Sequence, residues 1–203
     1  MTASAIPHSG EIPTLATACD AGERLRIRMR SIGALVMGSF GALWSAAGLA
    51  LSSAPAWAWT VLAIVFLAFG VRALQLRRET PPAAEPLPAA IAERRRRGNR
   101  IFAWTSFGEG LGIFLAVNIV ANLGHPQWQP AAAMLVVGLH FFPQVSAFSY
   151  RPHAVTGVAM TAWALAYPWL FAAGAMAPAG MLGAGAILFA SAAWALRSAA
   201  AKG

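Results

Sequence analysis

Six stretches of apolar sequence recur along this chain, and each is close to the length of helix that crosses a bilayer. They cover residues 31–52, 56–75, 101–123, 131–149, 154–174 and 178–197. A transmembrane helix needs about 20 predominantly apolar residues, and inside lipid a helix satisfies its own backbone polar groups. The sequence therefore predicts an all-α fold, a polytopic membrane protein built as a six-transmembrane-helix bundle.

The composition excludes several other classes of protein. With 58% hydrophobic and 11% charged residues, the 203-residue chain has too little polar surface to coat a soluble globule. The net charge of +8 lies in segments beside the apolar stretches, where orientation signals and anionic lipid headgroups account for it, so we expect no nucleic-acid partner. Cys19 is the only cysteine, which excludes disulfides within the chain and multi-cysteine metal sites.

The basic residues predict the orientation of the bundle. All fifteen Lys and Arg residues fall on one side of the membrane if successive stretches cross it in alternate directions, whereas the opposite connections at 53–55, 124–130 and 175–177 carry no formal charge. Basic loops stay on the cytoplasmic side. We therefore expect both termini to be cytoplasmic.

Charge and proline content divide the chain into five parts. These are a cytoplasmic tail (1–30), a transmembrane hairpin (31–75), a Pro-rich and Arg-rich cytoplasmic loop (76–100), a four-helix transmembrane unit (101–197) and a second tail (198–203). Residues 1–23 lack the apolar core of a signal peptide and are expected to be disordered, and the Pro-rich section 79–88 is expected to be extended and mobile.

The run Arg94, Arg95, Arg96 and Arg97 has two interpretations. Arginine runs commonly flank membrane helices on the cytoplasmic side, so the first interpretation is a topology anchor for the third stretch. The second is a docking patch for anionic lipid or for an acidic protein partner.

Glu109 is the only acidic residue inside an apolar stretch. An acid within the membrane costs at least ~2.5 kcal/mol and commonly marks a pathway or a proton relay. Because no Lys or Arg lies at its depth, we expect Glu109 to be protonated or strongly hydrogen-bonded near neutral pH. Gly108 and Gly112 form a small-residue pair that allows a neighbouring helix to approach closely.

Asn118 and Asn122 form a second polar stripe on the same stretch. Nine residues at 100° each place Asn118 on the opposite side of the helix from Glu109. A helix with polar groups on two faces is expensive to expose to lipid, so the stretch 101–123 is expected to lie at the centre of the bundle.

The following stretch supplies a partner for Glu109. The short connection 124–130 returns the chain antiparallel, and His140 then reaches the same depth as Glu109, with Gln144 one turn away on the same face. Pro143 cannot donate a helical hydrogen bond to the Leu139 carbonyl, which leaves that group open beside His140. We predict that Glu109 and His140 interact directly or through one water, unless helix rotation turns their faces apart.

The candidate site is thus a mid-membrane polar pocket formed by Glu109, Asn118, Asn122, His140 and Gln144. The alternative for the Asn and Gln residues is hydrogen bonding that only holds helices together. The sequence contains no zinc, nucleophile-elbow or phosphate-loop motif. We therefore expect no enzymatic activity, no cofactor and no metal.

The segment Gly138-Leu139-His140-Phe141-Phe142-Pro143, together with the Gly-Glu-Gly-Leu-Gly run at 108–112, resembles a group of small uncharacterised bacterial six-span membrane proteins. The resemblance covers mainly residues 101–153. It implies a six-helix plan in a bacterial cytoplasmic membrane, and it brings no activity, cofactor or binding residue.

Two functions are open at this point. The first is transport or binding of a small solute or a proton through the pocket around Glu109. The second is that of a non-catalytic accessory or scaffold subunit, whose basic loop or helix faces dock a partner and whose polar groups serve assembly.

Overall fold

The computed structural model describes residues 15–82 and 88–200, and within these ranges it is helical with no strand. The predicted all-α fold is confirmed. The elements, in order, are α1 (Leu15–Leu51), α2 (Ala56–Glu79), α3 (Ala89–Asn122), the 3₁₀ turn η1 (Pro126–Trp128), α4 (Gln129–Phe148), α5 (Pro152–Leu170), the 3₁₀ turn η2 (Gly174–Met176) and α6 (Pro178–Ala200).

Five of the described helices are long and apolar enough to cross a membrane, namely α1, α2, α3, α4 and α6. The remaining helix, α5, contains polar residues and two prolines that lower its hydropathy. His153, Thr156, Tyr167 and Pro168 are all buried, so these residues face protein, where a polar side chain costs less than it does in lipid. The chain is a multi-pass helical membrane protein.

Two helices extend beyond the predicted apolar stretches. The expected disorder of residues 1–23 is wrong from Leu15 onward, where α1 begins, and residues 1–14 lie outside the described part. Helix α3 begins at Ala89, so the arginine run is helical rather than part of a loop. Alanine and arginine are strong helix formers, which explains both extensions. Of the Pro-rich section, residues 83–87 lie outside the described part.

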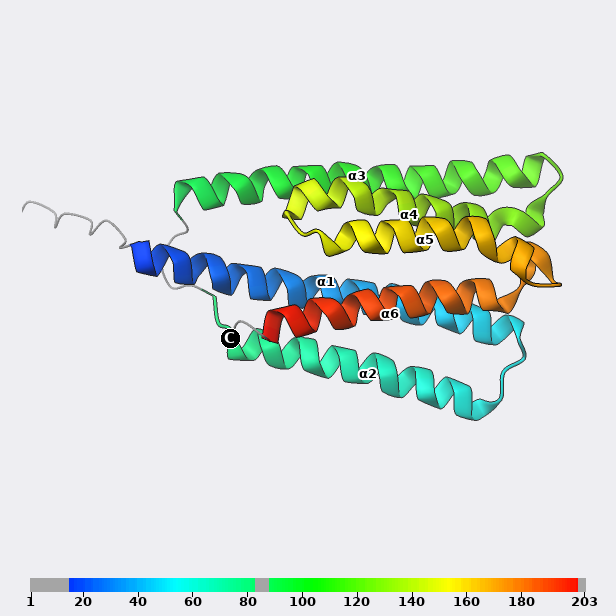
Figure 1. The fold of residues 1–203 in the computed structure, drawn as a ribbon, viewed down its shortest axis with the longest axis horizontal. Coiled ribbons are helices and arrows are strands. Elements are labelled where there is room, and N and C mark those ends of the chain that lie inside the picture. Colours follow the sequence, from blue (N-terminus) through cyan, green and yellow to red (C-terminus); the bar gives the residue numbers. More distant parts are fainter. Residues whose placement is uncertain (1–14, 83–87, 201–203) are drawn as a thin grey trace, which may run out of the picture.

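The helices form a layered arrangement in which α3 lies at one edge and α2 at the opposite edge (Figure 1). Helix α3 packs on α4 and η1, α4 packs on α5, and α5 packs on α6, while α1 contacts both α2 and α6. The predicted central position of the stretch 101–123 is therefore wrong. The polar stripe that contains Asn118 does not force α3 inward, because the Asn118 side chain donates to the Phe114 carbonyl of its own helix.

The most extensive helix contact is the antiparallel one between α1 and α6. A Cβ atom added to Gly185 would lie 2.8 Å from the Gly41 carbonyl oxygen and would also meet the Ser45 hydroxyl. A Cβ atom added to Gly48 would lie 2.8 Å from Cγ of Leu182. In lipid, such close approach of small residues is what gains van der Waals contact between helices.

This packing predicts opposite effects for two Gly→Ala substitutions. Gly185→Ala is expected to lower the free energy of unfolding by about 1–3 kcal/mol, because the methyl group overpacks the α1/α6 contact. Gly70→Ala on α2, where nothing lies within 4 Å of the added Cβ, is expected to be neutral or to stabilise by up to ~1 kcal/mol. Unfolding of the purified protein in detergent measures both, and a neutral Gly185→Ala would contradict the assigned contact.

Candidate functional site

Glu109 on α3 and His140 on α4 lie side by side in the interface between these two helices. His140 Nδ1 is 3.4 Å from Glu109 Oε1, and the side chains are 12% and 19% exposed. The predicted contact between these two residues is confirmed. Counting residues along the antiparallel hairpin located the pair, and the rotation of both helices, which the sequence left open, brings the two side chains together.

Glycines set the separation of α3 and α4, although only one of the two expected glycines contributes. A Cβ on Gly112 would lie 3.0 Å from Val136 Cγ1, whereas Gly108 has nothing within 4 Å. The closest approach is at Gly98, near the inner end, where a Cβ would lie 2.7 Å from the Ala147 carbonyl oxygen. These contacts hold the two helices close enough for Glu109 to reach His140.

Gln144 completes a connected chain of three polar side chains. Its Nε2 lies 2.6 Å from His140 Nε2, and Gln144 is only 6% exposed. On the other side of the ring, His140 Nδ1 lies 2.8 Å from the Val137 carbonyl oxygen. The imidazole therefore bridges Gln144 and Glu109 through its two ring nitrogens.

The hydrogen-bond partners assign the tautomer of His140. An amide –NH₂ group only donates and a carbonyl oxygen only accepts. In the arrangement of the structure, Nε2 therefore accepts from Gln144, and Nδ1 carries the proton and donates to Val137. A proton arriving at Nε2 would require the Gln144 amide to turn its oxygen toward the ring, so this side chain responds to the charge of His140.

Asn118 and Asn122 do not belong to this cluster, which corrects the predicted five-residue pocket. Asn118 is exposed and its Nδ2 donates to the Phe114 carbonyl over 2.7 Å. Asn122 is exposed at the last position of α3. The helical repeat explains the result, since nine residues turn Asn118 away from Glu109. Three of the five predicted residues come together: Glu109, His140 and Gln144.

A second histidine, His153, lies close to this cluster and was not among the predicted site residues. His153 is the second residue of α5, is 8% exposed, and contacts the ring of Phe141 at a centroid distance of 5.8 Å. Phe141 in turn contacts His140 at 4.6 Å. The signal available in the sequence was a second histidine, His153, near the start of the helix that follows His140. No group of three His, Cys, Asp or Glu side chains in the described residues could hold a metal ion.

No family model, no curated protein and no solved structure matches this chain. The assignment of a function therefore depends on the geometry of Glu109, His140 and Gln144 and on the charge distribution around them.

The contact between Glu109 and His140 predicts thermodynamic coupling. In a double-mutant cycle with Glu109→Gln and His140→Phe, the losses of unfolding free energy should be non-additive by more than ~0.5 kcal/mol, as expected for side chains in contact. A matched cycle that pairs His140→Phe with Asn118→Leu should be additive, since Asn118 faces away. Unfolding in detergent provides the free energies, and additive losses in the first cycle would contradict the contact.

Proposed function

We propose that this protein is a non-enzymatic membrane protein that binds and moves protons, or a small protonatable solute, through the cluster of Glu109, His140 and Gln144. The observation that carries the proposal is the 3.4 Å approach of Glu109 to His140 in the interface between α3 and α4. An acid at this depth is costly, and its pairing with an imidazole is the arrangement used by intramembrane proton relays.

The chemistry of the imidazole ring supports a relay. With the proton on Nδ1, the ring can accept a second proton at Nε2 and then release the Nδ1 proton to the Glu109 carboxylate. One proton has then crossed the ring, and His140 is left as the Nε2–H tautomer. Rotation of the Gln144 amide accommodates this tautomer, because its oxygen can accept from Nε2–H. For net transfer, Glu109 then releases its proton onward and a turn of the His140 ring restores the Nδ1–H tautomer, because the reverse exchange would return the proton to its source.

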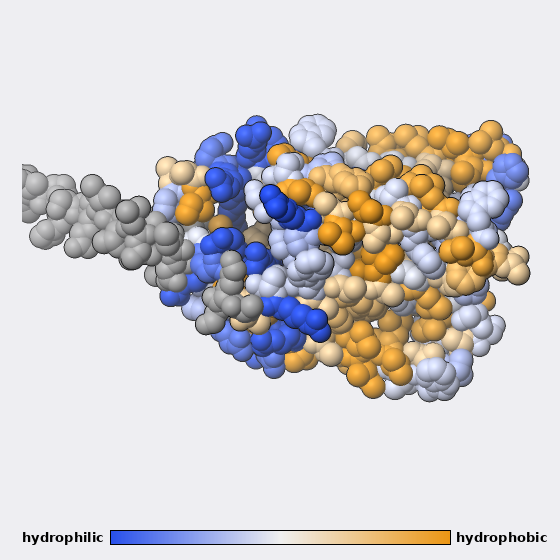
Figure 2. Space-filling view, in the orientation of Figure 1, coloured by the Kyte–Doolittle hydropathy of each residue, from blue (hydrophilic) through white to orange (hydrophobic). Residues whose placement is uncertain are grey.

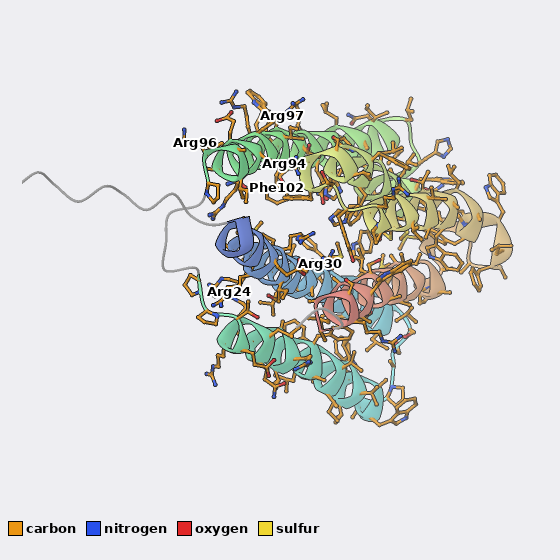
Figure 3. All side chains as sticks on the ribbon, turned by 60° about the vertical axis from the view of Figure 1, so that its left-hand side comes forward. Arg24, Arg30, Arg94, Arg96, Arg97 and Phe102 are labelled. Carbon is orange, nitrogen blue, oxygen red and sulfur yellow. The ribbon has the colours of Figure 1, made fainter. Side chains whose placement is uncertain are left out.

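We further propose that all six helices, α5 included, cross a bacterial cytoplasmic membrane with both chain termini in the cytoplasm. Helix α5 has 19 residues, which at 1.5 Å per residue gives roughly 28 Å, close to the ~30 Å hydrocarbon core. The most hydrophilic surface lies at the end of the bundle where α1 and α3 begin (Figure 2), and Arg24, Arg30, Arg94, Arg96 and Arg97 gather there (Figure 3). Basic residues favour the cytoplasmic side.

The orientation predicts which positions react with an impermeant thiol reagent. In a Cys19→Ser background, cysteines at Ser53 and Gln127 should label from outside intact cells, because they lie in the uncharged connections. A cysteine at Arg96 should label only after the cells are permeabilised, and a reporter fused after Gly203 should be active only if it works in the cytoplasm. Labelling of the Arg96 position from outside would overturn the orientation.

The proposed relay predicts that Glu109→Gln abolishes flux. In proteoliposomes with an imposed pH gradient, the wild type should dissipate the gradient or accumulate solute, and Glu109→Gln should not, because the amide cannot exchange a proton. Expression and thermal stability should stay close to wild type. The matched control is Glu79→Gln at the inner end of α2, where the carboxylate lies 3.8 Å from Arg72, and it should retain flux. Loss of folding in Glu109→Gln equal to the loss of flux would instead support a structural role.

One observation favours the second function, an accessory or scaffold subunit. Arg94, Arg95, Arg96 and Arg97 are all exposed at the inner end of α3, where they form a surface suited to anionic lipid or an acidic partner. Purification in mild detergent separates the two functions. A stoichiometric partner retained by the wild type and lost when the four arginines are replaced by Gln supports the accessory role, whereas a protein that purifies alone and conducts protons supports the relay.

A further inference from the structure

A cleft of about 220 Å³ opens between α5 and α6 near the end of the bundle that carries the arginines, and it is separate from the Glu109 cluster. Most of its wall is apolar, and Met37 of α1 lines it as well. The apolar residues are Met37, Val155, Ala159, Ile187, Ala190 and Trp194. Val155 and Trp194 are about half exposed, at 54% and 51%, so the cleft opens sideways toward the surrounding lipid.

Polar groups line the inner part of the same cleft. The hydroxyls of Thr156 and Ser191 lie 2.7 Å apart across α5 and α6, and one donates to the other. The hydroxyl that accepts this bond donates its own proton to a carbonyl of its own helix, that of Pro152 or of Ile187. His153 differs from them, because its Nδ1 is buried and has no hydrogen-bond partner in the described part of the chain. A buried polar atom without a partner costs about 1–3 kcal/mol. This nitrogen is buried beneath protein atoms, so a ligand in the cleft does not reach it.

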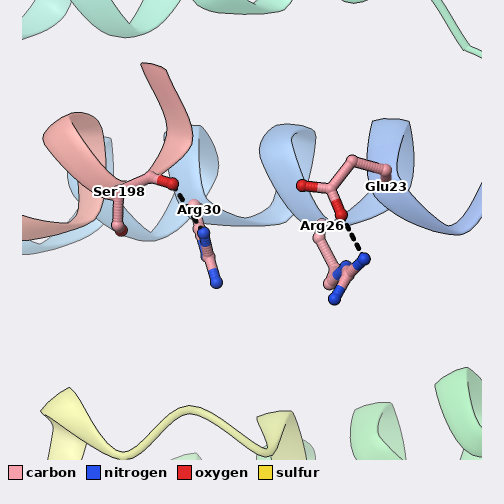
Figure 4. A network of polar contacts seen from close by, with 4 residues as sticks. All are labelled: Glu23, Arg26, Arg30 and Ser198. Atoms are coloured by element: carbon pink, nitrogen blue, oxygen red, sulfur yellow. Dashed lines mark hydrogen bonds and ion pairs between the residues drawn. The ribbon is translucent and has the colours of Figure 1, made fainter. Parts of the chain in front are cut away.

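Arg30 supplies positive charge at the mouth of the cleft. Its guanidinium lies over the ring of Tyr150, 5.3 Å from the centroid, and Tyr150 lines the cleft. One terminal nitrogen donates to the Ser198 carbonyl over 2.7 Å, and the other points away from Ser198 (Figure 4). A guanidinium has five N–H donors and matches the geometry of phosphate. The bond to Ser198 therefore positions Arg30 without using up its capacity to bind an anion.

We propose that this cleft binds one anionic phospholipid from the cytoplasmic leaflet. An acyl chain lies between α5 and α6 against Ile187 and Trp194, and the phosphate lies at Arg30. The apolar wall together with a single basic group at its mouth selects an anionic amphiphile over a free phosphate, which would leave the wall without a partner. The site is independent of the proposed relay.

Quenching of tryptophan by brominated lipid tests the site. The full-length protein is reconstituted in phosphatidylcholine vesicles that contain increasing fractions of brominated phosphatidylglycerol or, separately, brominated phosphatidylcholine. The Trp194 signal is the difference between wild type and Trp194→Phe. Half-maximal quenching of Trp194 is expected at a roughly fivefold lower mole fraction of the anionic lipid, the preference that one basic residue near the membrane surface typically gives.

Variants separate the site from a general effect of surface charge and from misfolding. Arg30→Gln should abolish the preference for phosphatidylglycerol, Arg30→Lys should keep it, and Arg26→Gln, an exposed arginine on the same helix, should leave it unchanged. Ala190→Phe should fill the cleft and remove saturable quenching, whereas Ala63→Phe on the exposed face of α2 should not.

Four results would overturn the proposal, and three of them concern the preference for the anionic lipid. The first is equal quenching by the two lipids in the wild type, the second is a loss of preference in Arg30→Lys, and the third is an equal loss in Arg26→Gln and Arg30→Gln. Weak quenching by both lipids would also overturn it, because it would mean that a protein surface, such as a second copy of the chain, covers the cleft.

Discussion

The close packing of α1 against α6 is the contact on which the rest of the bundle depends. These are the first and last helices in the described part of the chain, and Gly41, Gly48 and Gly185 let their backbones approach. Lipid is as apolar as a leucine side chain, so helix association in a membrane depends on contact between close-packed surfaces. On α6, Ala184, Ala192 and Ala199 are almost completely buried, which extends the contact along the helix. The same pairing brings Arg30 to Ser198 and so fixes the mouth of the lipid cleft.

The need to accommodate an acid in the membrane explains the organisation of α3 and α4. Glu109 gains His140 as its neighbour, and Gln144 and the Val137 carbonyl hold that imidazole in one orientation. A buried polar chain of this kind is stable only if each member finds a partner. The cluster of Glu109, His140 and Gln144 lies at the edge of the bundle, between α3 and α4 only. The ring of Phe141 separates it from His153.

The sequence predicted the helices well, because apolar length is a local property. It predicted the contact of Glu109 with His140 for the same reason, since depth follows from counting residues along an antiparallel hairpin. It did not predict which face of each helix meets protein. Hydropathy is the same for a leucine that faces lipid and one that faces another helix, so α3 was expected at the centre and Asn118 was placed in the pocket. The burial of His153 and the α1/α6 contact were missed because they depend on helix rotation and on pairing across the whole chain.

The measurement closest to the central claim is the tautomer of His140, read by ¹⁵N NMR of histidine-labelled protein in lipid, with the signal assigned by its loss in His140→Phe. The connected chain of Glu109, His140 and Gln144 predicts a proton on Nδ1 and a hydrogen-bonded, unprotonated Nε2 in the neutral ring. In Gln144→Leu the hydrogen bond to Nε2 should be lost and its resonance should shift. A neutral ring with its proton on Nε2, unaffected by Gln144→Leu, would contradict the connected chain and with it the proposed relay.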